Sequence, residues 1–221
     1  MTCTTSKTPR VRRSSAALLL AFALAWAGAA RAADEKTAPA VASMREITDE
    51  VLAILNDHAL DHPGRVAKIE NVAIERFNFP LMTQLVLGKN RSALSAEQQD
   101  QFEKEFKDHL SLTYGRQIDR YTSNEKITIG DGRLESNGDV TVRTRITGGS
   151  AGEGVQIDYR LRADPGGGWR IIDVIPEGVS LIQNFRAQVQ DIVTQQGVAH
   201  LIDTLHQRNA ERRAQQPPAA G

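Results

Sequence analysis

The spacing of apolar residues changes twice along this chain, and this change limits its fold more than any other feature of the sequence. A spacing near 3.6 residues, typical of helices, gives way to alternation with a period of two and then returns. The helical stretches are residues 41–58, 65–74, 95–121 and 181–205. The strand candidates are residues 126–129, 140–146, 155–162 and 169–175. This order predicts an α+β fold with N-terminal helices, a four-stranded sheet and C-terminal helices.

Short turn segments separate the strand candidates. Asn137-Gly138, residues 148–154 and residues 164–168 are all rich in glycine and too short for a crossover. Parallel strands need a crossover of a dozen or more residues, so the sequence predicts an antiparallel sheet. Val140 and Val155 each begin a segment in which apolar and polar residues alternate. We therefore expect one apolar face and one charged face.

Residues 1–32 have the pattern of a cleavable signal peptide. Basic residues precede an apolar run from Ala16 to Ala30, and Ala30 with Ala32 supplies the small residues that signal peptidase recognises. The run is shorter than the ~20 residues of a membrane-spanning helix. We therefore expect a protein secreted into the periplasm, with an uncleaved anchor and twin-arginine export through Arg12-Arg13 as alternatives.

Removal of this leader changes the charge balance of the chain. The leader holds five of the 27 Lys and Arg residues and none of the 27 Asp and Glu residues, which leaves a net charge near −5. An acidic chain has no electrostatic attraction to nucleic acid, so no nucleic-acid partner is expected. Cys3, the only cysteine, also lies in the leader, and the mature chain therefore has no disulfide.

The mature chain is long enough for one domain with a sizeable core. Residues 33–40 and 209–221 are rich in Ala, Pro, Gln and charged residues, and we predict a disordered linker and a disordered tail there. Residues 41–208 then form the single domain.

Motifs for catalysis, metal binding and nucleotide binding are weak. The histidines are scattered and none has the spacing of a metal site, so no metal and no cofactor are expected. The glycine clusters lie between strands rather than before a helix, which does not suit phosphate binding. Asp173 is a candidate for a buried catalytic acid, as in isomerases with a carboxylate in an apolar pocket. The alternative for Asp173 is a hydrogen-bonded structural carboxylate, and Ser180 is interpreted as a helix cap.

The order of residues from Val155 to Leu205 resembles the toluene-tolerance (MlaC-like) family of periplasmic phospholipid-binding transport proteins. The residues that carry the resemblance are Tyr159-Arg160-Leu161, Trp169, Asp173-Val174, Gly178-Val179-Ser180, Phe185-Arg186 and Gly197. Upstream, the matching residues are Phe79, Leu87-Gly88, Gln98-Gln99, Phe102, Phe106 and Thr113-Tyr114. The resemblance covers residues 45–207 and departs from the family at Asn90-Arg91, where a Trp is common.

The resemblance implies a lipid carrier, not an enzyme, in which the C-terminal helices pack on one sheet face around an apolar cavity. The residues expected to bind lipid are Leu85, Phe106, Leu110, Tyr114, Val142, Ile146, Val155, Ile157, Tyr159, Leu161, Trp169, Ile171, Phe185 and Val189. The implied partners are a phospholipid cargo, an inner-membrane ABC lipid-transport complex and an outer-membrane lipoprotein complex, between which lipid is shuttled to maintain outer-membrane asymmetry. The alternatives are a hopanoid-associated or other lipid carrier of this family and an enzyme with an isomerase-like pocket.

The charged face of the sheet is a candidate docking surface. Its basic residues are Arg143, Arg145, Arg160 and Arg162. Ion pairing of these arginines with acids such as Asp158 is the alternative.

Overall fold

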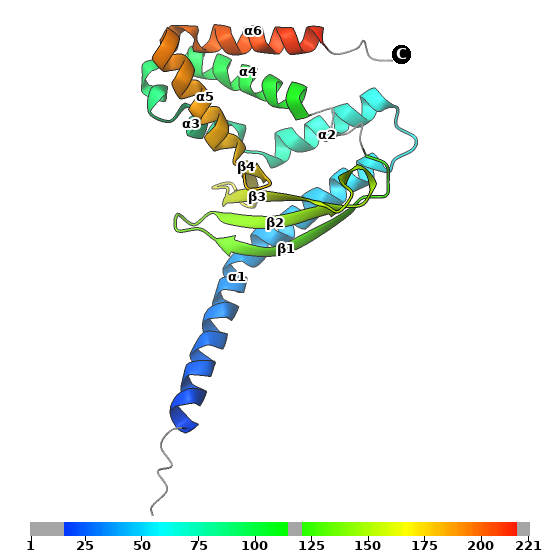
Figure 1. Cartoon of the computed structure of the whole chain (residues 1–221), viewed down its shortest axis with the longest axis vertical. Coiled ribbons are helices and arrows are strands. Elements are labelled where there is room, and N and C mark those ends of the chain that lie inside the picture. Colours follow the sequence, from blue (N-terminus) through cyan, green and yellow to red (C-terminus); the bar gives the residue numbers. More distant parts are fainter. Residues whose placement is uncertain (1–15, 115–120, 216–221) are drawn as a thin grey trace, which may run out of the picture.

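The computed structural model describes residues 16–114 and 121–215, and its elements follow the predicted order (Figure 1). The helices are α1 (Ala16–Leu55), α2 (His62–Arg76), α3 (Phe79–Leu87), α4 (Ala96–Tyr114), α5 (Leu181–Gln196) and α6 (Leu201–Ala214). The strands are β1 (Lys126–Leu134), β2 (Val140–Thr147), β3 (Val155–Ala163) and β4 (Trp169–Pro176). Short 3-10 helices are η1 (Gly88–Ala93), η3 (Gly149–Ala151) and η4 (Val198–His200). The predicted α+β fold is confirmed.

The strands form one antiparallel sheet in the order β1-β2-β3-β4, as their short connections predict. Val140 pairs with Leu161 and Val142 pairs with Tyr159, so the apolar residues of β2 and β3 share one face. The register between β1 and β2 shifts before Gly132, and the register between β3 and β4 shifts after Arg160. Bulges of this kind bend a strand and increase its twist.

Helix α1 covers the apolar face of the sheet and contacts all four strands. The resulting cluster, here called the sheet core, consists of Ala40, Met44, Ile47, Val72, Val140, Val142, Leu161 and Ile171. Gly132 lies at a close contact between α1 and β1, because a Cβ at this position would lie 2.7 Å from the Cβ of Thr37 and 3.1 Å from the Cγ2 of Val41. A glycine at the bulge therefore lets the helix lie directly against the strand.

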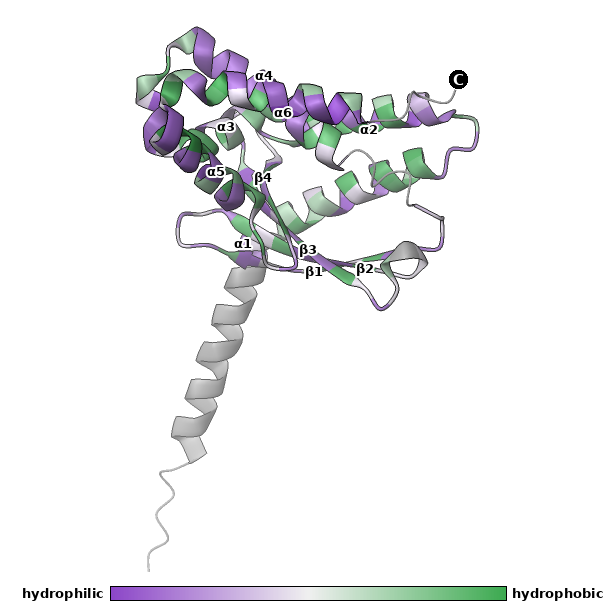
Figure 2. Cartoon of the chain, turned by 45° about the horizontal axis from the view of Figure 1, so that its top comes forward, coloured by the Kyte–Doolittle hydropathy of each residue, from purple (hydrophilic) through white to green (hydrophobic). Residues whose placement is uncertain are grey.

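Helices α3, α4, α5 and α6 enclose a second cluster, here called the helical core. Its residues are Phe79, Met82, Val86, Leu87, Leu94, Phe102, Phe106, Ile172, Leu181, Ile182, Phe185, Val189, Ile192, Leu201 and Leu205. The ring of Phe106 stacks with that of Phe102, with centroids 6.2 Å apart, and meets Phe185 edge to face at 5.2 Å. Figure 2 shows hydrophobic and hydrophilic residues on different sides of these helices, as amphipathic helices require.

The C-terminal helices do not cover the apolar face of the sheet as expected. The helix over the apolar face is the N-terminal α1, whereas α3 and α5 reach the sheet at its edge strand β4. The apolar stripe of Ala40, Met44 and Ile47 explains this placement, since it fills the face that the C-terminal helices were expected to cover.

The predicted linker and tail need correction. Residues 33–40 lie within α1, where Thr37 and Ala40 are only 3% and 0% exposed, so this segment is not a disordered linker. Helix α6 continues to Ala214, and Asn209 is buried, so the chain is folded well beyond residue 208. Residues 1–15 of the predicted leader and residues 216–221 of the predicted tail lie outside the described residues, as do residues 115–120.

A buried polar network holds α6 to α4. The Nδ1 atom of His109 lies 2.8 Å from the Oδ1 atom of Asn209, and the Asn209 amide donates to the backbone and side-chain oxygens of Glu105, each at 2.8 Å. His109 also meets the ring of Phe185 edge to face at 5.3 Å. Burial lowers the pKa of His109, and the cations of α6 act in the same direction. The neutral imidazole is therefore the form that fits this interface.

Because the pKa of His109 is lowered in the folded protein, we expect the free energy of unfolding to decrease as the pH falls through the ordinary pKa of histidine, 6.5. The unfolded chain takes up a proton there that the folded His109 resists, so acid favours unfolding. His109→Gln keeps an amide that can hydrogen-bond with Asn209 but cannot titrate. We expect urea unfolding between pH 7 and pH 5 to show a smaller loss of stability in this variant than in the wild type, and equal losses would contradict the prediction.

Candidate functional site

The residues expected to bind lipid separate into three groups in the structure. Leu85, Phe106, Leu110, Phe185 and Val189 belong to the helical core or pack against it. Val142, Tyr159, Leu161, Trp169 and Ile171 belong to the sheet core or pack against it. The remaining residues, Ile146, Val155, Ile157 and Tyr114, lie outside both clusters. Tyr114 is 39% exposed at the end of α4.

The helical core is closely packed. The void between α4, α5 and α6 has a volume of about 20 Å³ and is lined by Phe106, Phe185 and Val189 among others. Sites for small-molecule ligands usually occupy ~300–1,000 Å³. This void therefore has no room for an acyl chain, and it does not supply the expected apolar cavity.

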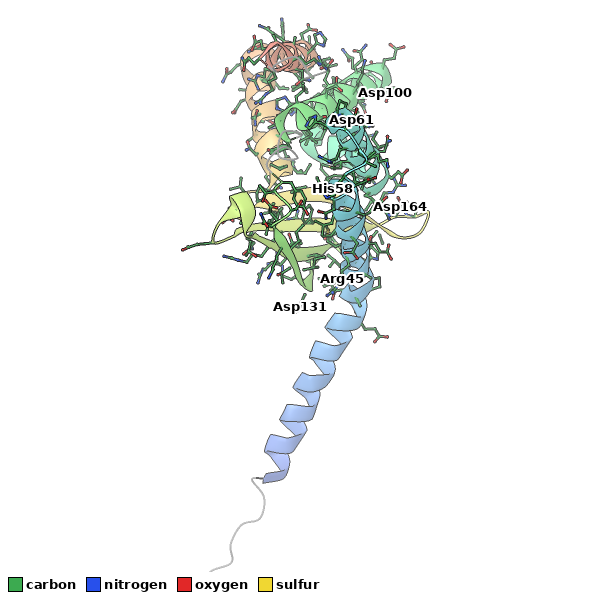
Figure 3. The ribbon with its side chains drawn as sticks, turned by 90° about the vertical axis from the view of Figure 1, so that its right-hand side faces the viewer. Arg45, His58, Asp61, Asp100, Asp131 and Asp164 are labelled. Carbon is green, nitrogen blue, oxygen red and sulfur yellow. The ribbon has the colours of Figure 1, made fainter. Side chains whose placement is uncertain are left out.

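A wider groove of about 300 Å³ lies between α1 and the β1 bulge. Its lining residues are Thr37, Ala38, Val41, Ala42, Arg45, Asp131 and Gly132. Figure 3 labels Arg45 on α1 and Asp131 close to it, and both line this groove. Two opposite charges in so small a groove suit polar groups better than hydrocarbon, because a charge loses hydration beside an acyl chain.

The apolar face of the sheet extends beyond the part that α1 buries. Ile146 pairs with Val155, and Ile157 lies two residues further along β3 on the same face. These three side chains are half-buried and belong to neither core. Together with Tyr159, which lies next to them on β3, they form what is here called the open patch. It is the part of the apolar face that the described helices leave incompletely covered.

Tyr159 links the open patch to the sheet core, against which it packs. Burial raises the pKa of its phenol to about 12, because the surrounding protein disfavours the charged phenolate. Part of the side-chain surface nevertheless remains accessible. The phenol is neutral at physiological pH, so the patch carries no charge there.

Two residues join the helical core to the sheet core. Phe77 and Val174 each pack against both clusters. Phe77 forms a bridge with Ile171 and stacks on Phe79 with ring centroids 5.7 Å apart. Val174 pairs with Tyr159 across β3 and β4, so the junction of the two cores adjoins the open patch.

Neither junction residue was among the predicted site residues. A signal for the junction was present in the sequence, because Ile171-Ile172 interrupts strict alternation in β4. Consecutive apolar residues in a strand indicate burial on both sides. In the structure Ile171 belongs to the sheet core and Ile172 to the helical core.

Asp173 is a structural carboxylate. It accepts hydrogen bonds from the Ser180 hydroxyl at 2.6 Å and the Ile182 backbone N–H at 3.1 Å, and an Arg160 nitrogen lies 3.6 Å away. Ser180 in turn caps α5 by accepting from the Gln183 N–H at 3.0 Å. The interpretation of Ser180 as a cap is confirmed. The carboxylate of Asp173 is occupied at the first turn of α5 and lies outside the open patch.

The basic face of the sheet is partly neutralised. Arg162 pairs with Asp139 at 2.6 Å and Arg160 pairs with Asp173, whereas Arg143 and Arg145 are exposed. Among residues 16–114 and 121–215, no cluster of three or more potential metal ligands is present. Over the same ranges, none of the helices combines the length and the apolar character that crossing a membrane requires.

The sequence of this chain is similar to those of two known proteins. The chain is 26% identical over 141 residues to the intermembrane phospholipid transport system binding protein MlaC of Haemophilus influenzae. The aligned region covers 63% of this chain and 65% of that protein. It is 29% identical over 101 residues to the toluene tolerance protein ttg2D of Pseudomonas putida, 46% of each chain. The chain therefore matches less than two thirds of the length of either relative.

A solved structure has the same fold. A phospholipid-binding protein from Ralstonia solanacearum, determined in complex with a phospholipid, aligns with a TM-score of 0.69 and 28% identity. The alignment covers 78% of this chain and 97% of that chain. The family model described as MlaC protein matches residues 45–207, well over half of the sequence. This chain therefore belongs to the MlaC protein family.

Proposed function

We propose that this protein is a periplasmic phospholipid carrier. The observation that carries the proposal is the alignment, over 97% of its length, of a related protein that holds a phospholipid. The chain supplies the complementary feature, an apolar sheet face that its own helices leave partly open at Ile146, Val155 and Ile157. A carrier needs such a surface and needs no reacting group.

The energetics of lipid transfer require an apolar site. A two-tailed phospholipid buries about 30 methylene groups in a bilayer, which at ~0.8 kcal/mol each amounts to roughly 25 kcal/mol against water. A protein that offered only polar contacts would not compete with the membrane. A site of comparable apolarity makes the transfer an exchange between similar environments, and the equilibrium constant then lies near one.

The acyl chains are proposed to enter at the open patch and to separate the two cores at Phe77 and Val174. These residues contact both clusters, so parting the cores exposes apolar surface on each side. Tyr159 lies at this boundary as a neutral group. The void between α4, α5 and α6 offers only about 20 Å³, and this separation is proposed to provide the space that the acyl chains need.

Export and partners follow from the same proposal. The leader, residues 1–32, is proposed to direct the chain to the periplasm, between two membranes that both contain phospholipid. The resemblance to the MlaC-like family names an inner-membrane ABC lipid-transport complex and an outer-membrane lipoprotein complex as the partners between which lipid is shuttled. Arg143 and Arg145 are exposed, and Arg145 also donates to the Glu153 carbonyl at 3.1 Å; this part of the basic face is proposed as the docking surface.

The carrier proposal predicts that the protein purifies with lipid. Protein secreted into the periplasm is extracted gently, and bound lipid is identified by native mass spectrometry and thin-layer chromatography. We expect a mass increment that corresponds to phospholipid. A hopanoid in the extract would assign a different cargo, and a protein that stays empty after incubation with phospholipid vesicles would contradict the proposal.

A bulky side chain in the open patch is expected to reduce lipid binding. Ile157→Trp fills the partly accessible face, so we expect at least a fivefold lower ratio of phospholipid to protein, which corresponds to about 1 kcal/mol. Val179→Trp is the matched control, since Val179 is 56% exposed in the loop before α5. Equal lipid content in both variants would place the cargo elsewhere, provided that thermal unfolding shows both to be folded.

A further inference from the structure

The turn between β4 and α5 joins the sheet to the helical core at the edge of the open patch. Pro176, the last residue of β4, pairs with Ile157 of the patch, and the Val179 N–H donates to the Pro176 carbonyl at 2.9 Å. Glu177 and Gly178 have positive φ angles of 48° and 82°. Positive φ at both central residues, with this hydrogen bond, is the geometry of a type I′ turn. The chain therefore leaves the sheet beside the open patch through a tight turn.

Glu177 is an unusual residue for the first central position of such a turn. Among the residues that the structure describes, only Ser123 and Glu177 combine a side chain with a positive φ. Type I′ turns favour Gly, Asn and Asp at this position. A glutamate there is strained, and the strain persists only where other contacts hold the residue in place. The shape of the turn alone does not account for a glutamate.

The contacts of Glu177 hold the turn against β3. Its backbone N–H donates to the Gln156 carbonyl at 2.9 Å, and its Oε1 atom accepts from the Gln156 N–H at 2.6 Å. This pair of hydrogen bonds is here called the latch. It meets β3 between Val155 and Ile157, two residues of the open patch. Because Glu177 is exposed, water can replace its partner when the latch opens.

The second anchor of the turn is buried. Asp173 is 1% exposed and accepts from the Ser180 hydroxyl and the Ile182 N–H, which holds the start of α5 on β4. Opening this anchor would leave a buried carboxylate without these two donors, which costs far more than hydrating an exposed group. The latch is therefore the anchor that opens first. Residues 176–179 then move away from β3 while α5 stays on β4.

We propose that Glu177 is a positioning residue that holds the β4–α5 turn over the edge of the open patch and limits the rate at which lipid passes. With the latch formed, Pro176 lies beside Ile157. With the latch open, the turn leaves β3 and access to the patch widens on that side. The latch joins two parts of the protein and does not contact the cargo, so entry and exit of lipid change together. This inference rests on the proposed carrier function and on entry at the open patch.

Two variants separate the latch from the shape of the turn. Glu177→Asn introduces a residue that type I′ turns favour, but its side chain is one methylene shorter and does not reach the Gln156 N–H. Glu177→Gln keeps the length of the side chain and an acceptor oxygen, and removes only the charge. Asn does not strain the turn, so a faster rate in that variant cannot come from a distorted turn.

The rate is measured on purified protein loaded with a phospholipid that has a fluorescent acyl chain. Vesicles of phosphatidylethanolamine and phosphatidylglycerol that contain a quencher are added in excess, and the loss of fluorescence reports transfer. We expect transfer about fivefold faster for Glu177→Asn, the effect of losing one net hydrogen bond, and within about twofold of the wild type for Glu177→Gln. The amount of lipid bound at equilibrium is expected to be the same in all three proteins.

Hydrogen exchange in lipid-free protein tests the latch without the cargo. The Gln156 amide is expected to exchange about fivefold faster in Glu177→Asn than in the wild type, and Glu177→Gln is expected to restore its protection. Equal transfer rates in the three proteins would overturn the inference, as would a Glu177→Gln protein as fast as Glu177→Asn. A wild-type protein that takes up no phospholipid would refute the carrier proposal together with this inference. A wild-type protein that carries lipid, with equal rates in the variants, would refute this inference alone.

Discussion

Strand β4 is the element on which both hydrophobic cores depend. Its neighbouring residues Ile171 and Ile172 are each only 1% exposed, yet one belongs to the sheet core and the other to the helical core. Asp173 follows directly and fixes the start of α5 through Ser180 and the Ile182 N–H. The position of the helical core relative to the sheet is therefore set by three consecutive residues, and Phe77 and Val174 complete the junction from either side.

This construction suits a protein that exchanges a hydrophobic cargo. A single close-packed core admits little, because interiors are packed at crystal-like density and have few voids larger than a water molecule. Two cores that meet along one strand have a boundary, and it is there that the apolar surfaces are proposed to part and admit an acyl chain. The open patch lies at that boundary through the pairing of Tyr159 with Val174. Its side chains are apolar or neutral, which an acyl chain requires.

Much of the fold was predictable because it depends on local patterns. Alternation in β2 and β3 and the glycine-rich turns identified the sheet, and Ser180 identified the start of α5. The predictions of a disordered linker and a disordered tail were wrong because they missed contacts between distant parts of the chain. Ala40 lies in a segment whose composition is typical of a linker, but it is buried on the sheet. Asn209 lies in a segment whose composition is typical of a disordered tail, but it forms hydrogen bonds with residues about one hundred positions away in the sequence. The residues expected to bind lipid lie in two separate cores for the same reason. Periodicity identifies the apolar face of a helix or strand, but it does not identify the element that packs against that face.

The most direct test of this account measures the distance between the two cores with and without lipid. Cys3 is the only cysteine of the sequence and lies in the proposed leader, so in a chain without residues 1–32 Thr128→Cys on β1 and Ala187→Cys on α5, both at exposed positions, take spin labels at defined sites. Electron paramagnetic resonance then gives the label-to-label distance. If bound lipid separates the two cores, the distance is longer in protein loaded with phospholipid than in lipid-free protein. An unchanged distance in protein shown to contain lipid would contradict it.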